Sequence, residues 1–252
     1  MKPISRRRLI TAGVAATAGV AGLAVAARMA GRNGLVPPAC RGTLGVGDSL
    51  TYAAQRVLTA HSLAREFSRD MISKAPFANE IAPPNDAFKK QQASGFVDWR
   101  LSVEGLVAHP GLYSISELKG LPAKSHITEI ACEEGWSYIA EWIGTPLYEV
   151  LNAAGALPQA RYVAYFSSDK DWWDSIDMAD AMHPQTLLAW GMNDGDLPVP
   201  FGGPLRMRVP RQLGYKNVKF INRILVTDSV KRLGSGAGSP EPDYGYSWYA
   251  GI

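Results

Sequence analysis

The chain has 252 residues and a formal net charge of +3, from 26 lysines and arginines against 23 aspartates and glutamates. Six of the basic residues and none of the acidic ones lie in residues 1–40, which leaves 20 basic against 23 acidic side chains, a net charge of −3, in the rest. This balance excludes a basic surface for nucleic-acid binding. The roughly 210 residues that follow residue 40 are enough for one globular domain with its own core.

Residues 1–40 have the composition of a twin-arginine export signal. Arg6, Arg7 and Arg8 precede 19 uncharged residues, 9–27, that are rich in Ala, Gly and Thr. Three glycines and two threonines make this run a poor membrane span, although a tether through an uncleaved signal or through Cys40 stays open as an alternative. We therefore expect a periplasmic protein. Because this route exports folded proteins, it also favours a cofactor that is inserted before export.

Residues 41–95 are expected to lead into the functional domain, which we place at 96–252. The first part, 41–75, has a partly amphipathic pattern and is expected to be helical. The second part, 76–95, contains Pro76, Pro83 and Pro84 and is expected to be irregular and extended.

Within 96–252, many short β-prone runs alternate with few helical ones, which indicates a mixed α+β fold. A helix-like stretch is expected after Cys132, and a flexible stretch at 234–239. The expected strands are 97–107, 125–131, 161–167, 205–209 and 221–227, and the expected helices are 116–121 and 146–154.

Several familiar sites lack support. The four histidines do not form HExxH or another zinc-ligand spacing. A strand followed by GxGxxG, a GxxxxGK[ST] loop and a CxxCH motif are absent from the sequence, and the serines lack a GxSxG context. His183 is therefore expected to be a structural histidine, and Trp136 to pack in the core.

Two features remain that carry chemistry. Cys132 is the one cysteine after residue 40, so it serves either passive burial or metal and redox chemistry. Five cations lie within 14 residues around Gly214, either as a solvated strand face or as a phosphate cradle. A soft thiolate suits a high-valent transition metal, and a metal carried on a phosphorylated organic ligand would need both features. The five cations are Arg206, Arg208, Arg211, Lys216 and Lys219.

A set of short motifs recurs in a specific order and spacing. They are CEEGWS at 132–137, WIGTPL at 142–147, AMHPQTL at 181–187, GPLR at 203–206, LGYKNVK at 213–219 and YGY at 244–246. Together they make residues 96–230 resemble the molybdopterin-binding domain of the sulfite oxidase family, in particular the branch of periplasmic protein-methionine-sulfoxide reductase catalytic subunits. The resemblance implies that family's mixed-sheet fold and a molybdenum-molybdopterin cofactor.

The resemblance also implies residue roles. Cys132 would be the protein ligand to molybdenum. The cofactor would further be held by Asn79, Ser167, Arg206, Lys216, Asn217, Val218 and Lys219. Phe201 departs from the family pattern, because relatives carry Asn or His five residues before this arginine, and one polar contact to the cofactor is lost.

Glu134 stands two residues after the expected ligand. On an extended backbone, positions i and i+2 face the same side, so its carboxylate is expected to point toward the metal and relay protons; a solvent-facing acid is the alternative. Glu133 and Glu134 would repel sulfite. We therefore expect reduction of S-oxides or N-oxides, with a membrane haem protein as electron donor. The alternatives are a sulfite dehydrogenase that passes electrons to a cytochrome and a non-catalytic domain of the same fold.

Overall fold

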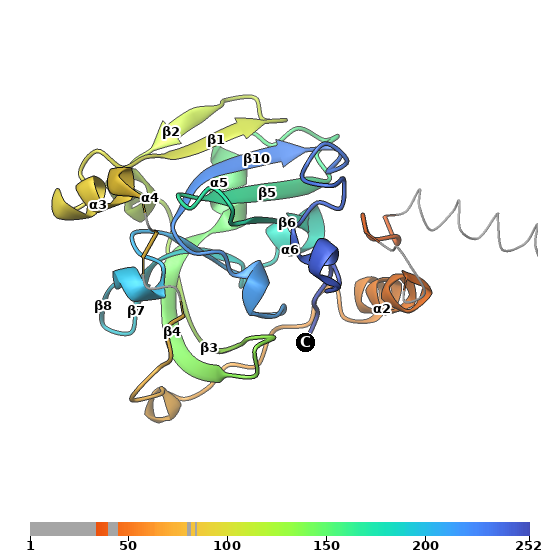
Figure 1. Ribbon diagram of the computed structural model, residues 1–252, viewed down its shortest axis with the longest axis horizontal. Coiled ribbons are helices and arrows are strands. Elements are labelled where there is room, and N and C mark those ends of the chain that lie inside the picture. Colours follow the sequence, from red (N-terminus) through yellow and green to blue (C-terminus); the bar gives the residue numbers. More distant parts are fainter. Residues whose placement is uncertain (1–33, 40–44, 80–81, 84) are drawn as a thin grey trace, which may run out of the picture.

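The computed structural model describes residues 34–39, 45–79, 82–83 and 85–252 (Figure 1). Most of the predicted export signal, including the arginines at 6–8 and Cys40, lies outside the described residues. Within the described ranges, no helix has the length and apolar character that crossing a membrane requires.

The first sheet has five strands in the order β2-β1-β10-β5-β6. Strands β1 and β10 run parallel, and the other neighbours run antiparallel. The strands are β1 Leu101–Gly105, β2 Gly111–Tyr113, β5 Tyr162–Ser167, β6 Trp173–Asp177 and β10 Ile221–Thr227.

The second sheet is antiparallel and has the order β3-β4-β7-β8, with β9 paired to β7. Strands β3 and β4 form a hairpin whose register runs from Lys124 opposite Gly144 to Ala131 opposite Ser137. Cys132 therefore begins the hairpin turn. The strands are β3 Lys124–Ala131, β4 Ser137–Pro146, β7 Leu187–Met192, β8 Gly195–Asp196 and β9 Arg206–Arg208.

Helices are short and lie around the two sheets. Helix α3 begins where the Asn85 side chain accepts a hydrogen bond from the Phe88 amide at 2.8 Å, and α4 begins at a capping box between Ser114 and Glu117. The α-helices are α2 Gly45–Leu58, α3 Asp86–Ala93, α4 Ile115–Gly120, α5 Leu147–Ala153 and α6 Met178–Ala181. The 3-10 turns are η1 Arg69–Met71, η2 Val199–Phe201, η3 Gly214–Lys216 and η4 Glu241–Tyr244.

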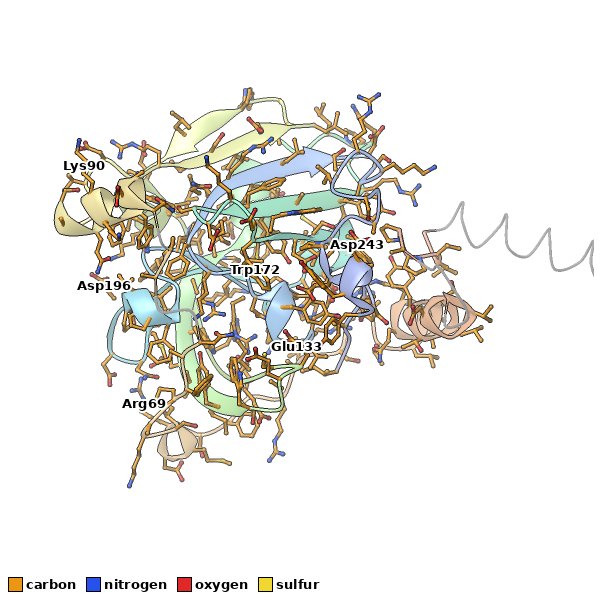
Figure 2. All side chains as sticks on the ribbon, in the orientation of Figure 1. Arg69, Lys90, Glu133, Trp172, Asp196 and Asp243 are labelled. Carbon is orange, nitrogen blue, oxygen red and sulfur yellow. The ribbon has the colours of Figure 1, made fainter. Side chains whose placement is uncertain are left out.

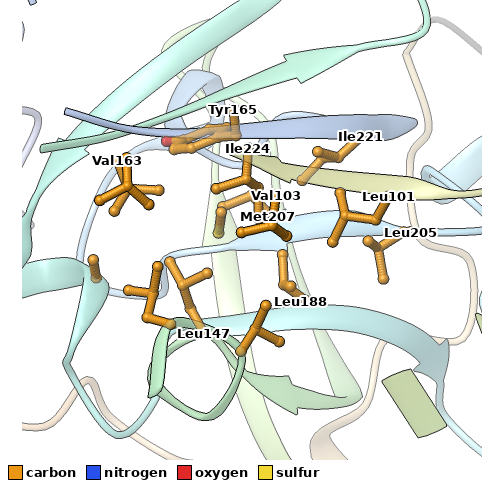
Figure 3. Packing of buried hydrophobic residues seen from close by; sticks show 14 of the residues in the cluster. Leu101, Val103, Leu147, Val163, Tyr165, Leu188, Leu205, Met207, Ile221 and Ile224 are labelled. Carbon is orange, nitrogen blue, oxygen red and sulfur yellow. The ribbon is translucent and has the colours of Figure 1, made fainter. Parts of the chain in front are cut away.

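The main core lies between the two sheets (Figure 3). Val103 and Ile224 come from the first sheet, Leu188 and Met207 from the second, and Leu147 from α5; all are fully buried. Burying each such side chain contributes about 1.5–3 kcal/mol. A smaller cluster packs around Trp142 on the second sheet, next to the hairpin that carries Cys132.

The α+β prediction is confirmed, as are strands at 125–131, 161–167 and 221–227 and both predicted helices, each within one or two residues. Four details were wrong. In the described part of 41–75, helix is limited to α2 and the 3-10 turn η1, and 76–95 contains α3. The stretch after Cys132 is a turn followed by β4 rather than a helix. The strand expected at 97–107 is shorter and spans Leu101–Gly105. Flexibility at 234–239 stays a prediction; Gly234 and Ser235 are exposed there, whereas Ala237 and Ser239 are buried.

Candidate functional site

A tight turn holds Cys132 at the end of the β3–β4 hairpin. The Cys132 amide donates to the Trp136 carbonyl at 2.9 Å, and the Gly135 amide donates back to the Cys132 carbonyl at 3.0 Å. Gly135 has a φ of +92°, which only glycine adopts without strain. The thiol is therefore fixed by the hairpin, and Glu133 and Glu134 lie within its turn.

The loop at Gly214 packs directly on this cysteine. A Cβ at Gly214 would lie 3.1 Å from Cys132 Cα and 3.3 Å from its Sγ, closer than side chains normally approach. The amide of Leu213 donates to the Ala250 carbonyl at 3.0 Å, so the C-terminal segment holds this loop in place. The glycine that the sequence placed in an anion loop is thus a close neighbour of the thiol.

A cavity of about 200 Å³ opens beside Cys132. Two of its lining residues, Glu133 and Trp172, are labelled in Figure 2. A second cavity of about 270 Å³ shares Trp172 and Lys219 with it and contains Ser167. Of the predicted site residues, the first cavity is lined by Asn79, Cys132, Glu134, Arg206, Asn217 and Lys219.

Arg206 brings a buried positive charge to this cavity. Its two terminal nitrogens donate to the carbonyls of Phe201 and Asn217, each at 2.7 Å. Its Nε has no partner in the described part of the chain, and no ion pair of Arg206 occurs there. Burial lowers the pKa of the guanidinium. Because a buried charge without a counter-ion is costly, Arg206 fits a site that binds an anion.

Lys219 lies on the same wall and ties the lead-in segment to the cavity. Its Nζ donates to the Asn79 carbonyl and, at 2.9 Å, to the Pro200 carbonyl. Gly202, at a φ of +111°, allows the approach, because a Cβ there would lie 3.0 Å from the Cβ of Arg206 and 3.1 Å from that of Lys219. Asn79, Arg206 and Lys219 are therefore brought together, as predicted.

Phe201 occupies the position where the family pattern has a polar side chain. Its ring packs edge-on against Tyr138, with centroids 5.9 Å apart, and its carbonyl accepts the bond from Arg206. The Phe201 side chain therefore makes an aromatic contact and offers no polar atom to a cofactor.

The other three cations of the predicted cradle point elsewhere. Arg208 donates to the Asn217 side chain and to the Glu129 carbonyl, and Arg211 donates to the backbone after α2. Lys216 is fully buried and binds Asp174 Oδ1 at 2.6 Å. The ammonium of Lys216 is therefore already neutralised by a buried carboxylate, and the cofactor binding expected at this residue stays a prediction.

Asn217 and Val218 shape the loop rather than offer free side chains. Asn217 Oδ1 accepts from Arg208 and from the Val209 amide, both at 2.7 Å, and its Nδ2 donates to the Leu213 carbonyl at 2.9 Å. The Val218 side chain belongs to the main core. Any cofactor contact at these two positions would be made by the backbone.

Acidic groups surround the thiol. Glu133 Oε2 accepts from Cys132 Sγ at 3.2 Å, and Glu134 Oε2 lies 4.0 Å from the same sulfur. Burial, with a smaller contribution from the two carboxylates, raises the pKa of Cys132 to about 12. The thiol thus keeps its proton unless a bound cation replaces it.

Glu134 reaches this position through the turn, not through an extended backbone, so the i, i+2 argument was wrong although the proximity it predicted is present. Its Oε2 accepts from Trp136 Nε1 at 2.7 Å. Trp136 lines the cavity and stacks on Tyr138 with ring centroids 5.9 Å apart, so it only partly packs in the core.

Other sites are less suited to chemistry. His183 is buried, and its Nε2 lies 3.2 Å from the Ser62 carbonyl oxygen. The ring is therefore held by the backbone, as expected of a structural histidine. Across the described ranges, no three His, Cys, Asp or Glu side chains gather as a metal site of their own. A larger cavity of about 620 Å³ beside α2 contains no thiol, and its Arg56 is already paired with Asp177.

The sequence did not single out three cavity residues. For Glu133 the sequence predicted only repulsion of sulfite, and for Tyr215, within the LGYKNVK motif, it predicted no role; both line the cavity. Trp172, between β5 and β6, reaches the cavity from a segment that carried no signal of its own in the sequence.

Comparison with known proteins gives a consistent result. The chain matches the family described as oxidoreductase molybdopterin binding domain over residues 88–233. It is 37% identical over 191 residues to a protein of Azospira oryzae named putative protein-methionine-sulfoxide reductase subunit, covering 76% of this chain and 69% of that one. It is 30% identical over 262 residues to the protein-methionine-sulfoxide reductase catalytic subunit of Ralstonia nicotianae, covering 96% and 74%.

A solved structure resembles the fold. The crystal structure of the sulfane dehydrogenase SoxCD from Paracoccus pantotrophus matches with a TM-score of 0.51 and 22% identity. The match covers 68% of this chain and 46% of that one, so this chain corresponds to less than half of the SoxCD chain. At this identity the likeness concerns the fold alone.

Proposed function

Because the chain belongs to the oxidoreductase molybdopterin binding domain family, we propose that it reduces S-oxides such as methionine sulfoxide, or N-oxides, at a molybdenum site. Membership in the family makes it a molybdopterin-binding oxidoreductase. The names of its relatives in Azospira and Ralstonia support methionine sulfoxide as the substrate class.

One observation carries the proposal: a half-buried thiol lines one cavity together with a buried guanidinium that has no carboxylate partner among the described residues. Cys132 would bind molybdenum, since a thiolate is a soft ligand and a bound cation favours loss of its proton. Arg206 and Lys219 would hold the phosphorylated pterin, and Asn79, Ser167 and the backbone at 217–218 would complete the binding surface. When bound, the cofactor supplies a metal that exchanges an oxygen atom in two-electron steps.

The acidic side chains act on protons and on substrate choice. A sulfoxide, two electrons and two protons give a thioether and water, so a proton donor is needed near the oxygen that leaves. Glu134, held in place by Trp136 Nε1, is placed to hold and transfer such a proton. Glu133 and Glu134 at the cavity also disfavour anionic substrates such as sulfite.

The compartment and the electron donor are part of the proposal. The arginines at 6–8 followed by the uncharged run 9–27 support twin-arginine export to the periplasm. For the electron donor we propose a membrane-bound haem protein.

Metal analysis and turnover of the exported protein test the proposal. We expect close to one molybdenum and one pterin per chain, and dye-linked reduction of methionine sulfoxide that exceeds oxidation of sulfite. Cys132→Ala should remove both metal and activity. An exported protein without molybdenum, a Cys132→Ala variant with full activity, or sulfite as the preferred substrate would each contradict it.

A further inference from the structure

Asp180 binds a helix and a loop with the same buried carboxylate. Arg56 of α2 donates to both of its oxygens, to Oδ1 at 3.0 Å and to Oδ2 at 2.7 Å. Gln212 Nε2 donates to Oδ2 as well. Because a buried carboxylate is costly without such donors, both must stay in place around it. The positions of Arg56 and Gln212 are therefore linked through Asp180.

Gln212 begins the loop that packs on Cys132. Its side chain is buried, and its Oε1 accepts from the Ala250 amide at 3.1 Å. Gly214 follows two residues later, where a Cβ would lie 3.1 Å from Cys132 Cα. The side chain of Gln212 is thus bonded on one side to Asp180 and on the other to the C-terminal segment. A displacement of Gln212 would move the loop relative to the thiol.

Arg211 holds the same end of the loop to the helix. Its guanidinium is buried and donates to the carbonyls of Thr59 and Ala60, which directly follow α2. Its Nη1 also lies 3.7 Å from Asp180 Oδ1. Two sets of contacts, through Asp180 and through Arg211, therefore join α2 to the residues that precede Gly214.

Helix α2 itself lies at the outer edge of the molecule (Figure 1) and contributes no described residue to the lining of the cavity at Cys132. Any effect of α2 on the thiol is therefore indirect. The bonds at Asp180 and Arg211 provide a connection through which such an effect can pass.

We propose that Gln212 is a positioning residue of the cofactor site, and that it couples the docking of α2 to the contact between Gly214 and Cys132. Coupling between two sites is reciprocal, so a cofactor bound at Cys132 should in turn hold α2 more firmly. The inference rests on the cofactor site of the proposed function, but not on the substrate that is reduced there.

Alkylation of Cys132 tests this coupling without a cofactor. The full chain is prepared from cells that do not make molybdopterin and is treated with iodoacetamide, and mass spectrometry follows the peptide that contains Cys132. Gln212→Met keeps the length of the side chain but cannot bond to Asp180 or Ala250. We expect alkylation to be about fivefold faster, the factor that loss of one buried hydrogen bond ordinarily gives, because Gly214 covers the thiol less firmly. An unchanged rate would overturn the proposal.

Thr186→Val is the matched control. Thr186 is 1% exposed, Gln212 is 2% exposed, and the Thr186 hydroxyl donates to the Asp180 carbonyl at 2.6 Å. This variant also loses a buried hydrogen bond at Asp180, but none that leads to the loop. Urea denaturation should show similar losses of stability in both variants, whereas alkylation should be faster only in Gln212→Met. Equal acceleration in both would mean that general destabilisation exposes the thiol, and the proposal would fail.

Arg56 tests whether the coupling extends to α2. Arg56→Gln alone should accelerate alkylation of Cys132 about fivefold, and Arg56→Lys, which keeps the charge that Asp180 binds, should restore part of the protection. Combined with Gln212→Met, Arg56→Gln should react well below the ~25-fold that independent effects would give. Rates that simply multiply would show that helix and loop act independently, against the proposal.

The cofactor-loaded protein gives the reciprocal measurement. Backbone amides of α2 should exchange hydrogen more slowly in loaded than in cofactor-free protein. This difference should disappear in Gln212→Met and persist in Thr186→Val; a difference that persists in Gln212→Met would overturn the coupling alone. Exported protein without molybdenum would instead contradict the proposed function, and the alkylation rates would still decide the role of Gln212.

Discussion

Two buried clusters of charged side chains meet at the segment 213–219. One, around Lys216, has an excess of acidic groups, and the other, around Arg206, has an excess of positive charge. Lys216 binds Asp174 at 2.6 Å, and a second buried carboxyl group, Glu241, lies near this pair, so this cluster has a surplus of acid. Arg206, whose Nη2 donates to the Asn217 carbonyl, has no acidic partner in the described residues, so its cluster has a surplus of positive charge.

The comparison indicates which cluster is structural and which binds a ligand. Protonation can neutralise the excess carboxyl groups, because burial raises the pKa of Asp174 to about 6 and that of Glu241 to about 7. An arginine keeps its proton at any pH that a protein experiences. The charge of Arg206 has no acidic counter-ion among the described residues, so we infer that a bound anion meets it, and the phosphate of molybdopterin would suit this role.

The largest effect is expected at the cluster of Lys216, Asp174 and Glu241. Asp174→Asn leaves Lys216 buried without its direct counter-ion, which should cost about 3–5 kcal/mol of unfolding free energy. Urea denaturation at neutral pH measures it. The control is Asp194→Asn, which removes an exposed ion pair with Arg69 and should cost less than about 1 kcal/mol. If both variants lost a similar amount of unfolding free energy, burial would not make the Lys216–Asp174 ion pair more important for stability than the exposed Arg69–Asp194 pair.

The second prediction concerns the unbalanced cluster. Arg206→Met removes a buried charge that has hydrogen bonds but no ion-pair partner in the described residues, so cofactor-free protein should lose less stability than Asp174→Asn. Retention of the pterin should instead fall by about a hundredfold, because charge-assisted hydrogen bonds to the phosphate are lost. Pterin fluorescence after gel filtration measures retention. Arg206→Lys keeps the charge and should retain more cofactor than Arg206→Met; the reverse order would contradict a role for the charge.

This difference between the clusters could not be predicted from the sequence. Five cations around Gly214 look equivalent along the chain, yet Lys216 and Arg211 are neutralised or hydrogen-bonded by groups from distant segments. Their partners, Asp174 and the backbone after α2, are close only in the folded protein. The sequence did indicate that Cys132 and the loop at Gly214 serve one cofactor. That indication came from two short motifs, 132–137 and 213–219, whose residues are each consecutive in the sequence.

The fold shows the same limit. Strands β3, β5 and β10 were predicted because their β-prone runs are bounded by turn residues. Strand β4 was missed because it pairs with β3 on one side and β7 on the other and is largely buried on both faces, so its residues do not alternate. Helix α3 was missed because prolines at 83 and 84 suggested an extended chain, whereas the cap at Asn85 starts a helix directly after them.

The third prediction tests the contact between the loop and the thiol. Gly214→Ala places a methyl group 3.1 Å from Cys132 Cα, so the loop must move away from the hairpin. We expect about tenfold weaker cofactor retention, equivalent to ~1.4 kcal/mol. Gly195→Ala, where a Cβ would meet no atom within 4 Å, is the control and should retain the cofactor normally. If Gly214→Ala binds as well as the control, close packing at the thiol is not required.

The smallest effect concerns pH and the surplus acid. Burial, then the neighbouring Asp174 and Glu133, raise the pKa of Glu241 to about 7 from an ordinary 4.5. Between these values the folded protein holds a proton that the unfolded chain has released, so this contribution to stability is complete below pH 4.5 and is lost as the pH rises through 7. Allowing for solvent screening, we expect unfolding free energy to fall by about 1 kcal/mol across this window.

Urea denaturation at several pH values between 4.5 and 8 measures the slope. Glu241→Gln should flatten the slope above about pH 6, because the amide stays neutral at every pH; below that pH the slope from Asp174, whose pKa is about 6, should remain. Asp243→Asn changes an exposed acid of the same 3-10 turn and should keep the slope of the unaltered protein. If the slope above pH 6 is unchanged in Glu241→Gln, Glu241 is not the group that binds the proton in this range. Asp174 is then the next carboxyl group of the Lys216 cluster to replace.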